Sequence, residues 1–564
     1  MTDLDAGNAT FYWSSTFFLS LQKMGVQHVV ISPGSRSTPL TLAAASHDHF
    51  QKHVILDERS AAFTALGIGK ATNIPAVLVC TSGTALANYY PAVIEARKSG
   101  IPLILATADR PPLLRDTGAN QATDQLKIFG DYPVLFHEVG EPGTTYKDLE
   151  RLQMLARQAV SAASTLRGPV HLNFPFRKPL EPDNNFLEKI LRENKDLKVS
   201  ETPCVTTSSV TFSGEISKAI SEASKPLIIV GPTAPSDDVD SISNLAKELC
   251  CPILAESTIG SQNTVAGFAG FLRNKAMFDE LEPDLILRFG FQPTSKSLEL
   301  GLKNWNPAHH FHFASTESWQ DATYSESEHI SWMGKPFKIK AISPSTQKAW
   351  LQKWEKAEQD FRSYTQKTIS ESSALTDGSV YHQITPQISN EKFIMVSNSF
   401  PARDILLFGR QQTSIPLFLN RGVSGIDGVT SSAFGISIGI QKPGVLFSGD
   451  LAFLHDTNAL LNHRLVGHPL TIMLINNNGG SIFRMLPVEQ HQRYFNHYFE
   501  TPQSANIKQL VNSYEIPYCS IDSISKLKDF DLSNWQQKHA GVSVIECRTD
   551  ADASMQLRKD LWNF

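Results

Sequence analysis

The sequence predicts an α/β protein made of three doubly wound parallel-sheet domains. Short apolar runs alternate with helix-forming segments along its 564 residues, and this alternation is typical of parallel sheets wrapped by helices. The alternation falls into three successive blocks of similar size, which we assign to residues 1–182, 208–342 and 375–564. Three blocks of one kind indicate a repeated architecture.

The first block contributes five expected strands with loops and helices between them. The strands are expected at residues 28–31, 54–56, 75–80, 103–107 and 170–174. Ser60 is a suitable N-cap for a helix of small residues over 61–72, which favours close packing. Polar and charged residues follow the strands, among them Arg36, Glu58 and Arg110.

The second and third blocks repeat this pattern after a linker rich in proline and charge at residues 175–203. Their strands are expected at 227–231, 252–255, 285–289, 310–313, 393–396, 445–447, 470–475 and 542–547, and a charged helix over 345–370 separates the two blocks. His310 and His312 share one face of their strand. No acidic residue is near them in sequence, so metal binding there is not expected.

Composition excludes several classes of protein. The chain has 51 Lys and Arg against 56 Asp and Glu, and its net charge of −5 indicates no nucleic-acid partner. No apolar run approaches the roughly 20 residues that cross a bilayer, and the acidic start lacks the features of a signal peptide. The six cysteines are scattered without CxxC spacing, which is typical of reduced thiols. We therefore expect a cytoplasmic protein that has no membrane partner.

The third block contains a βαβ unit that predicts a ligand site. Its apolar runs, 445–447 and 470–475, should be parallel neighbours whose carboxyl ends meet at one sheet edge. Ligands of such sheets bind at this edge. Asp450 follows the first run, and Asn477 and Gly479 follow the second. Their carboxylate, amide and carbonyl oxygens suit Mg²⁺, which keeps further positions for phosphate oxygens.

The spacing of these residues resembles the diphosphate motif of thiamine diphosphate enzymes. Asn477 follows Asp450 by 27 residues, and Gly449 precedes that aspartate. Leu451 stands where the motif commonly has glycine, a departure that some branches tolerate. The simpler interpretation, a Gly-Asp turn and an Asn-Gly turn with no ligand between them, stays open on these residues alone.

Two further features lie far away in the sequence and fit the same cofactor. Glu58 follows a strand and precedes a helix of small residues, and Thr81 to Thr84 form a glycine-containing loop at a strand end. In thiamine diphosphate enzymes, a glutamate of one domain hydrogen-bonds the aminopyrimidine held against another domain. Taken alone, Glu58 is more simply an exposed first-turn carboxylate favoured by the helix dipole. Together, the three features favour a thiamine diphosphate enzyme.

Longer matches indicate one branch of that family. The matching segments are residues 32–40, 57–59, 107–112, 118–121, 420–428 and 476–483. On these segments the chain resembles the menaquinone-pathway enzymes that make 2-succinyl-5-enolpyruvyl-6-hydroxy-3-cyclohexene-1-carboxylate. The resemblance spans the whole chain and is weakest in the middle block.

The resemblance implies a reaction and a cofactor. Enzymes of this branch transfer aldehyde or ketone residues: with thiamine diphosphate and Mg²⁺ or Mn²⁺ they decarboxylate 2-oxoglutarate and add the succinyl unit to isochorismate in a 1,4-addition. Glu58 is implied as the catalytic residue that meets the pyrimidine ring, and Ile426 as the apolar support of the bent cofactor. The implied cofactor-binding residues are Glu58, Thr81, Gly83, Ile426, Gly449, Asp450, Leu451, Asn477 and Gly479, and those implied as metal ligands are Asp450, Asn477 and Gly479.

The substrates set a charge requirement, because both are dicarboxylates and buried carboxylates favour bidentate guanidinium partners. The implied substrate-binding residues are Arg36, Arg110, Asn120, Gln121, Lys296, Ser399, Arg403, Arg421, Ile482, Phe483 and Leu486. Any single arginine is more simply a surface or ion-pair residue, but five cations in loops after strands favour anion binding. Ser297 stands where some relatives have arginine, which leaves the part played by the middle block open.

Other interpretations also stay open. An acetolactate synthase-like enzyme commonly carries flavin in its middle domain, and no convincing flavin loop is present. That enzyme or a 2-keto acid decarboxylase acting on pyruvate would have no use for the arginines. An inactive cofactor-binding scaffold is disfavoured because Glu58, Asp450 and Asn477 are all present. The resemblance further implies a homodimer or homotetramer with active sites at the subunit interface.

Overall fold

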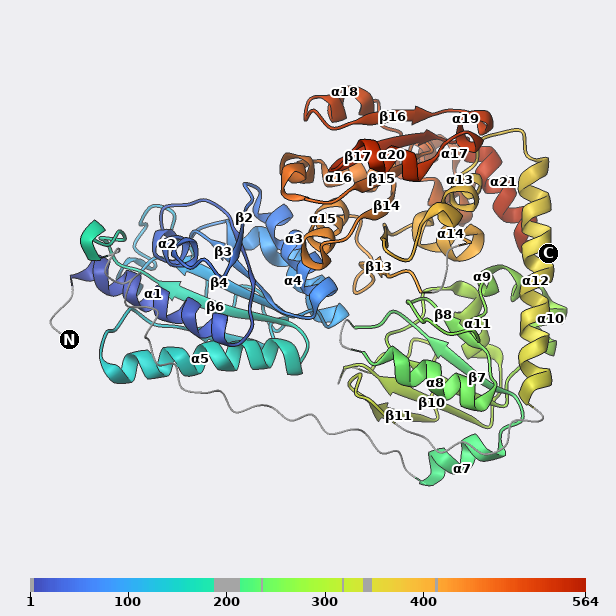
Figure 1. Ribbon diagram of the computed structural model, residues 1–564, viewed down its shortest axis with the longest axis horizontal. Coiled ribbons are helices and arrows are strands. Elements are labelled where there is room, and N and C mark those ends of the chain that lie inside the picture. The colour runs from blue at the N-terminus through green and yellow to red at the C-terminus, as the bar shows by residue number, and fades with distance from the viewer. Residues whose placement is uncertain (1–4, 187–213, 235–236, 317–318, 338–346, 411–413) are drawn as a thin grey trace. The chain divides into compact units, whose positions relative to one another are not determined.

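The computed structural model describes residues 5–186, 214–234, 237–316, 319–337, 347–410 and 414–564 (Figure 1). The described strands form three sheets, of six, five and six strands, and all their pairings are parallel. The predicted α/β class with parallel sheets is therefore confirmed. The chain divides into two compact units, Met1–Thr206 with Thr430–Gln441, and Thr207–Val429 with Lys442–Phe564.

The first unit contains the first sheet, with strand order β2-β1-β3-β4-β6-β5. Its strands are β1 (His28–Ile31), β2 (Gln51–Val54), β3 (Ala76–Cys80), β4 (Leu103–Asp109), β5 (Leu135–Glu138) and β6 (Pro169–Pro175). Its helices include α1 (Ala6–Lys23), α2 (Thr38–Ser46), α3 (Glu58–Thr72), α4 (Tyr90–Ser99) and α5 (Tyr146–Thr165), with short 3-10 helices at Leu86–Tyr89 and Pro112–Leu114. Strands β3 and β4 are buried at every position, as is typical of parallel strands covered on both faces.

Helices α1, α2 and α5 share one hydrophobic core with this sheet. Phe17 and Phe18 of α1 are fully buried, and the Phe17 ring meets the Phe174 ring of β6 edge-on, with 5.0 Å between centroids. Leu152 and Leu155 recur at helical spacing on α5 and are buried in the same core. This packing holds the strands whose carboxyl ends carry the first set of candidate site residues.

The second unit begins with the central sheet, in the order β11-β10-β9-β7-β8. Its strands are β7 (Pro226–Val230), β8 (Ile253–Ala255), β9 (Leu285–Phe289), β10 (His309–Ala314) and β11 (Glu328–Ser331). Its helices are α7 (Gly214–Glu222), α8 (Val239–Leu249), α9 (Phe268–Phe271), α10 (Lys275–Glu280) and α11 (Lys296–Asn304). The long helix α12 (Gln347–Glu371) follows.

A buried charge cluster lies beside β10. The fully buried Arg288 pairs with the Glu326 carboxylate and donates to Nδ1 of His312 at 2.8 Å. One ligand atom from each of His312, Glu326 and His329 lies within 4.8 Å of the other two. The carboxylate comes from a later segment, so the neighbouring sequence positions did not reveal it. Because the Arg288 guanidinium already neutralises Glu326, we assign this cluster a structural role.

The third sheet, also in the second unit, has the order β13-β12-β14-β15-β17-β16. Its strands are β12 (Phe393–Val396), β13 (Leu417–Leu419), β14 (Gly444–Gly449), β15 (Leu470–Asn476), β16 (Tyr518–Ile521) and β17 (Val542–Arg548). The helices of this region are α13 (Asp377–Ile384), α14 (Phe400–Phe408), α15 (Val429–Ile440, assigned mostly to the first unit), α16 (Asp450–His455), α17 (Gln492–Phe495), α18 (Ile507–Asn512), α19 (Ile524–Lys528), α20 (Leu532–Lys538) and α21 (Ala551–Trp562). Short 3-10 helices lie at Thr385–Gln387, Thr457–Leu465, Ser481–Met485 and Pro487–Gln490, and a π-helix at Asn496–Glu500.

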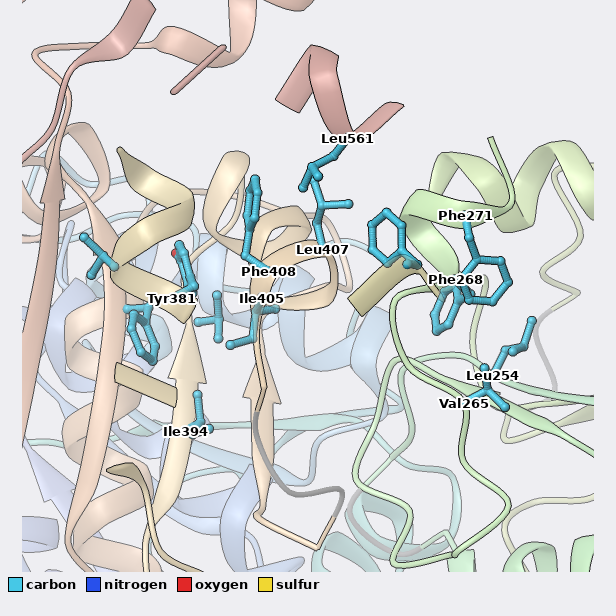
Figure 2. Close-up of a cluster of buried hydrophobic side chains, with 14 of the residues drawn as sticks. Leu254, Val265, Phe268, Phe271, Tyr381, Ile394, Ile405, Leu407, Phe408 and Leu561 are labelled. Carbon is cyan, nitrogen blue, oxygen red and sulfur yellow. The ribbon is translucent and has the colours of Figure 1, made fainter. Parts of the chain in front are cut away.

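One apolar cluster joins the central and third sheets within the second unit (Figure 2). Figure 2 labels Leu254, Val265, Phe268 and Phe271 from the central region, and Tyr381, Ile394, Ile405, Leu407, Phe408 and Leu561 from the third. Helix α12 contacts both regions: the Trp350 indole donates to the Pro226 carbonyl at 2.9 Å, and the Tyr364 hydroxyl donates to the Asp560 carbonyl at 3.3 Å. Burial of each large side chain contributes about 2–3 kcal/mol, so this shared core holds the two sheets together.

The beginning of α3 differs from the sequence prediction. The strand before it, β2, ends at Val54, so Ile55 and Leu56 belong to the connecting loop. The N-cap is Asp57 and not Ser60, because the Asp57 carboxylate accepts the N–H of Arg59 at 2.8 Å. The helix therefore begins at Glu58, three residues earlier than expected.

Other differences concern segments between strands. The part of the βαβ unit after Asp450 is a short α-helix followed by a 3-10 helix, not one continuous helix. Strands β5, β11, β13 and β16, each at the edge of its sheet, and helices α1 and α5 were not predicted. From residue 187 onward, the predicted linker lies outside the described residues, and the predicted domain boundaries stay predictions. None of the helices in the described ranges is apolar over a stretch long enough for a bilayer.

Candidate active site

The loops after β1 and β3 approach each other closely at the edge of the first sheet. The backbone N–H of Arg36 donates to the Thr81 hydroxyl at 3.2 Å. A Cβ on Gly34 would lie 2.3 Å from the Thr81 Cβ, so only glycine fits at position 34. The Arg36 side chain is 4% exposed, and its Nη1 donates to the Phe176 carbonyl at 2.7 Å. The structure thus brings the predicted residues Arg36 and Thr81 together.

Arg36, Arg110 and Asn120 line one pocket of about 530 Å³ in the first unit. The described residues around it also include Arg177 and Lys178, and none of them is acidic. The Arg110 Nε donates to the Asn120 carbonyl at 3.1 Å, which orients the guanidinium. Burial lowers the pKa of Arg36, and the nearby Arg110 charge lowers this pKa further. Two guanidiniums that repel each other favour an anion beside them.

Gln121 contacts the loop after β3. Its Nε2 donates to the Ser82 carbonyl at 2.9 Å, and the Ser82 hydroxyl donates back to the Gln121 carbonyl at 3.1 Å. Gly83 has a φ of +93°, and a Cβ there would lie 2.8 Å from the Gln121 Cγ. Gly83 is therefore required both by its backbone conformation and by this contact. The predicted residues Gln121 and Gly83 lie next to each other.

Glu58 is the first residue of α3 and is partly buried. Burial raises the pKa of Glu58, and the charge of Asp57 raises this pKa further. A fully exposed carboxylate at a helix N-terminus would have its pKa lowered by the helix dipole. The partial burial of Glu58 and the direction of its pKa shift differ from those of a fully exposed first-turn carboxylate.

In the second unit, Asp450 lies where β14 ends and α16 begins. Its carboxylate is 5% exposed and accepts the N–H of Leu451 at 2.8 Å and that of Gly479 at 2.7 Å. Burial raises the pKa of Asp450 to about 6, although both N–H donors act to lower it. Strands β14 and β15 pair in parallel, with Gly449 opposite Ile475. The predicted βαβ edge is confirmed.

The side chain of Asn477 and the carbonyl of Gly479 fit a metal site. The Asn477 Nδ2 donates to Asp377 at 3.0 Å, so its Oδ1 remains available as a ligand. Gly479 has a φ of +132°, and a Cβ there would lie 2.3 Å from the Glu500 carbonyl oxygen. The Gly479 carbonyl accepts the Ser481 N–H at 2.9 Å and keeps a second lone pair. With the Asp450 carboxylate, these are the hard oxygen donors that Mg²⁺ prefers.

A buried ion network behind Asn477 was not predicted. Asp377 accepts from the Thr549 hydroxyl at 2.6 Å and from the Arg558 guanidinium at 2.7 Å. Arg558 also pairs with Asp404, at 2.9 Å through its Nε. The three charged residues are each 1% exposed. They come from α13, α14 and α21, and no local motif links them, so the sequence held no signal for this network.

The loop that carries Arg421 and Ile426 is held by Asn398. Its Nδ2 donates to the carbonyls of Asn420 and Gly425 at 2.7 and 2.6 Å, and its Oδ1 accepts from Arg421 at 2.9 Å. Asn398 is buried, so these hydrogen bonds are protected from water. Sequence reasoning missed Asn398, although it directly precedes a predicted site residue.

Two of the five predicted cations lie on helices, which corrects the expectation that all are in loops. Arg403 is in the first turn of α14, and its Nη1 donates to the Ser399 carbonyl at 2.8 Å. Ser399 has a φ of +73°, a conformation uncommon for serine and often found at functional sites. Lys296 begins α11, and its exposed ammonium pairs with Glu299 at 2.6 Å. Ser297 is buried and donates to a backbone carbonyl, so it faces the interior and not a ligand.

The three predicted apolar wall residues share one short segment. Ile482 and Phe483 lie in the 3-10 helix after Gly480, and Leu486 directly follows that helix. The Phe483 ring packs edge-on against Phe499, with 5.8 Å between centroids. This segment follows Asn477 and Gly479 in the chain, and its role as a wall of the site stays a prediction.

The candidate residues thus form two groups. Those in the first unit are Arg36, Glu58, Thr81, Gly83, Arg110, Asn120 and Gln121. Those in the second unit are Lys296, Ser399, Arg403, Arg421, Ile426, Gly449, Asp450, Leu451, Asn477, Gly479, Ile482, Phe483 and Leu486. The first group offers a cationic pocket and a glutamate, and the second offers oxygen atoms suited to a metal ion.

Comparison with known proteins decides the family. Residues 14–128 match the N-terminal TPP binding domain of thiamine pyrophosphate enzymes, and residues 411–547 match the C-terminal TPP binding domain. Proteins named 2-succinyl-5-enolpyruvyl-6-hydroxy-3-cyclohexene-1-carboxylate synthase from Bacillus velezensis, Haloquadratum walsbyi and Trichodesmium erythraeum are 36%, 34% and 36% identical to this chain. These alignments cover 98%, 99% and 99% of this chain and 97%, 98% and 98% of the relatives.

The chain belongs to the 2-succinyl-5-enolpyruvyl-6-hydroxy-3-cyclohexene-1-carboxylate synthase family. The resemblance inferred from short segments is confirmed. The N-terminal match in this chain contains Glu58 and the pocket residues Arg36 and Arg110. The C-terminal match contains Asp450 and Asn477. The central sheet lies between the two matched regions.

Proposed function

We propose that this chain is a thiamine diphosphate- and Mg²⁺-dependent carboligase of menaquinone biosynthesis. It decarboxylates 2-oxoglutarate and adds the succinyl unit to isochorismate in a 1,4-addition. The products are CO₂ and 2-succinyl-5-enolpyruvyl-6-hydroxy-3-cyclohexene-1-carboxylate, the compound named by the synthase relatives. Family membership supports the reaction, and the two groups of site residues support the roles assigned below.

The observation that carries the substrate assignment is the cationic pocket of the first unit. Arg36 and Arg110 line it, no carboxylate is among its described lining residues, and the Asp109 charge behind the lining offsets only part of this positive charge. Both proposed substrates are dicarboxylates, which guanidinium groups bind through paired hydrogen bonds. A monocarboxylate such as pyruvate would leave part of this charge unmatched. The pocket therefore favours the proposed substrates over those of acetolactate synthase-like enzymes.

The residues of the chain have distinct roles in this proposal. Asp450, Asn477 and Gly479 hold the divalent ion, and that ion holds the diphosphate. Glu58 is assigned as the catalytic residue from the family resemblance: it would hydrogen-bond a ring nitrogen of the cofactor, and its partly buried position and raised pKa fit this role. Thiamine diphosphate, when bound, supplies the carbanion chemistry. The arginines orient the substrates and neutralise their carboxylates.

We further propose a homodimer or homotetramer in which Glu58 of one subunit faces Asp450 of its partner. The family resemblance supports this arrangement, and the presence of the site residues in two separate compact units is compatible with it. Sedimentation of the active enzyme tests it: a fully active monomer would contradict the shared site. Cytoplasmic location is part of the same proposal.

The activity test follows the loss of isochorismate absorbance with 2-oxoglutarate present. Consumption should require both thiamine diphosphate and a divalent metal, and pyruvate should not replace 2-oxoglutarate. Glu58→Gln is the matched variant, because it keeps the size of the side chain but not its acid: it should bind the cofactor and lose turnover. Full turnover by Glu58→Gln would contradict the catalytic role, and activity with pyruvate alone would favour a different thiamine diphosphate enzyme.

A further inference from the structure

A set of hydrogen bonds ties two functional segments of the first unit together. The substrate segment, residues 110–125, carries Arg110, Asn120 and Gln121, and the cofactor loop, residues 81–84, carries Thr81 and Gly83. In addition to the reciprocal pair between Gln121 and Ser82, the Thr123 hydroxyl donates to the Gly83 carbonyl at 3.3 Å. The Gly83 N–H donates to Oε1 of Gln125 at 3.1 Å. The two segments are therefore joined at four points.

Gln125 is the innermost of these contacts. It is fully buried, and its Nε2 donates to Oδ1 of Asn173 at 3.0 Å and to the Ala108 carbonyl at 3.3 Å. Its amide therefore has one possible orientation, with the oxygen toward the cofactor loop and the nitrogen toward the sheet. Gln125 thus links the cofactor loop with β4 and β6, which contain Ala108 and Asn173.

Asn173 continues the connection to the base of Arg110. It is fully buried, and its Nδ2 donates to Asp109 at 2.9 Å and to Glu138 at 2.8 Å. Asp109 in turn accepts the backbone N–H of Arg110 at 2.7 Å and the Arg115 guanidinium at 2.9 Å. A continuous hydrogen-bonded path therefore runs from the cofactor loop to both ends of the substrate segment.

We propose that Gln125 is a positioning residue that holds the substrate segment against the cofactor loop. This inference rests on the proposed function, since it assigns substrate binding to Arg110, Asn120 and Gln121. Gln125 does not line the cationic pocket, so it acts through the residues that it holds. Its loss should loosen both segments at once.

Two variants and one control test this role. Gln125→Glu keeps the size and the acceptor for the Gly83 N–H, but it removes the donors to Asn173 and Ala108 and places a carboxylate against their oxygens. Gln125→Ala removes all three hydrogen bonds. Thr117→Ala is the control: it lies in the same segment and is exposed, and its hydroxyl donates only to the Leu114 carbonyl within that segment.

The first measurement is amide hydrogen exchange without substrate or cofactor. Peptides that contain residues 81–84 and 119–125 should exchange about tenfold faster in both Gln125 variants, because buried polar groups lose their partners. Thr117→Ala should exchange like the unmodified protein. Unchanged exchange of residues 81–84 in both Gln125 variants would overturn the proposal. This readout needs no turnover, so it stays decisive even if the proposed reaction is wrong.

The second measurement is steady-state kinetics well below the melting temperature. The KM values for both dicarboxylates should rise about tenfold, and kcat should fall by a smaller factor. We expect this because substrate binding depends on the position of the substrate segment. The dissociation constant of thiamine diphosphate should rise as well. A variant that melts earlier but keeps both KM values would overturn the positioning role, since a purely structural residue gives that result. Failure of the unmodified enzyme to consume isochorismate would instead refute the proposed function.

Discussion

Replacing Asp377 by alanine tests whether the buried ion network orients a metal ligand. Asp377 accepts from the Asn477 Nδ2 at 3.0 Å, and this contact keeps the Asn477 oxygen available for the ion. Without Asp377, no other hydrogen bond among the described residues holds the amide in that orientation before the ion binds. Loss of such an outer partner lowers metal affinity about 10–100-fold, or about 1.4–2.7 kcal/mol. We expect the dissociation constant for Mg²⁺ in the presence of thiamine diphosphate to rise by this factor.

An opposing effect is too small to cancel this loss. Burial is the main cause that raises the pKa of Asp450 to about 6, and the Asp377 charge adds to it. Removal of that charge would ionise Asp450 more completely. At about pH 7.5, however, a group with a pKa of about 6 is already about 97% ionised, so the gain is below about 0.1 kcal/mol. The orientation of Asn477 should therefore decide the outcome.

The assay is a Mg²⁺ titration monitored by calorimetry, and Asp404→Ala is the matched control. Both aspartates are buried against Arg558, and removing one partner of such a pair costs about 3–5 kcal/mol of stability. Both variants should melt earlier, but only Asp377→Ala should bind the metal weakly. Asp377→Asn should recover most of the affinity, because its carboxamide oxygen can still accept from Asn477. Equal Mg²⁺ affinity in Asp377→Ala and Asp404→Ala would refute the reasoning.

Three further outcomes are expected. Gly479→Ala should lose Mg²⁺ binding and melt earlier in calorimetry, because its Cβ would lie 2.3 Å from the Glu500 carbonyl oxygen at a φ of +132°; normal binding would contradict this. Arg110→Lys should raise the KM for both dicarboxylates about tenfold in initial-rate assays, since lysine lacks the planar fork and the Nε bond to Asn120; an unchanged KM would exclude a direct contact. Burial lowers the pKa of His171 from 6.5 to about 3, so below pH 6.5 the unfolded chain protonates this histidine while the folded protein keeps it neutral. The stability that the neutral His171 contributes is therefore complete above pH 6.5 and is lost as the pH falls toward 3. Between pH 7 and pH 5, urea unfolding should therefore show the unmodified protein losing about 2 kcal/mol more than His171→Phe, and equal losses would contradict the assignment.

Most of the inner strands could be predicted because buried parallel strands consist largely of apolar residues. The predicted runs 285–289 and 393–396 coincide with β9 and β12, whose residues are all buried. Prediction was weaker at the sheet edge: β2 alternates between exposed and buried residues, and its position was misjudged by a few residues. Helix starts depend on one hydrogen bond: Ser60 was predicted as the cap of α3, but Asp57 makes the capping hydrogen bond.

The sequence could predict those residues of the candidate site that lie in short segments directly after strands. The candidate metal ligands Asp450, Asn477 and Gly479 belong to one βαβ unit, so the sequence alone could place them at one edge. The residues that orient them could not be found in this way. Asp377 and Arg558 are separated by most of the third block, and their contact depends on how α13 and α21 pack.

The sequence by itself determined the fold class and the family and supplied the candidate site residues, because these depend on local patterns of apolar, glycine and charged residues. Only the tertiary structure decided which oxygen or nitrogen each group presents. Hydrogen bonds between distant residues set those orientations: Asp377 determines the amide orientation of Asn477, and Gln125 determines how the cofactor loop meets the substrate segment. Buried polar groups must be paired, and the partners become known only when the chain has folded.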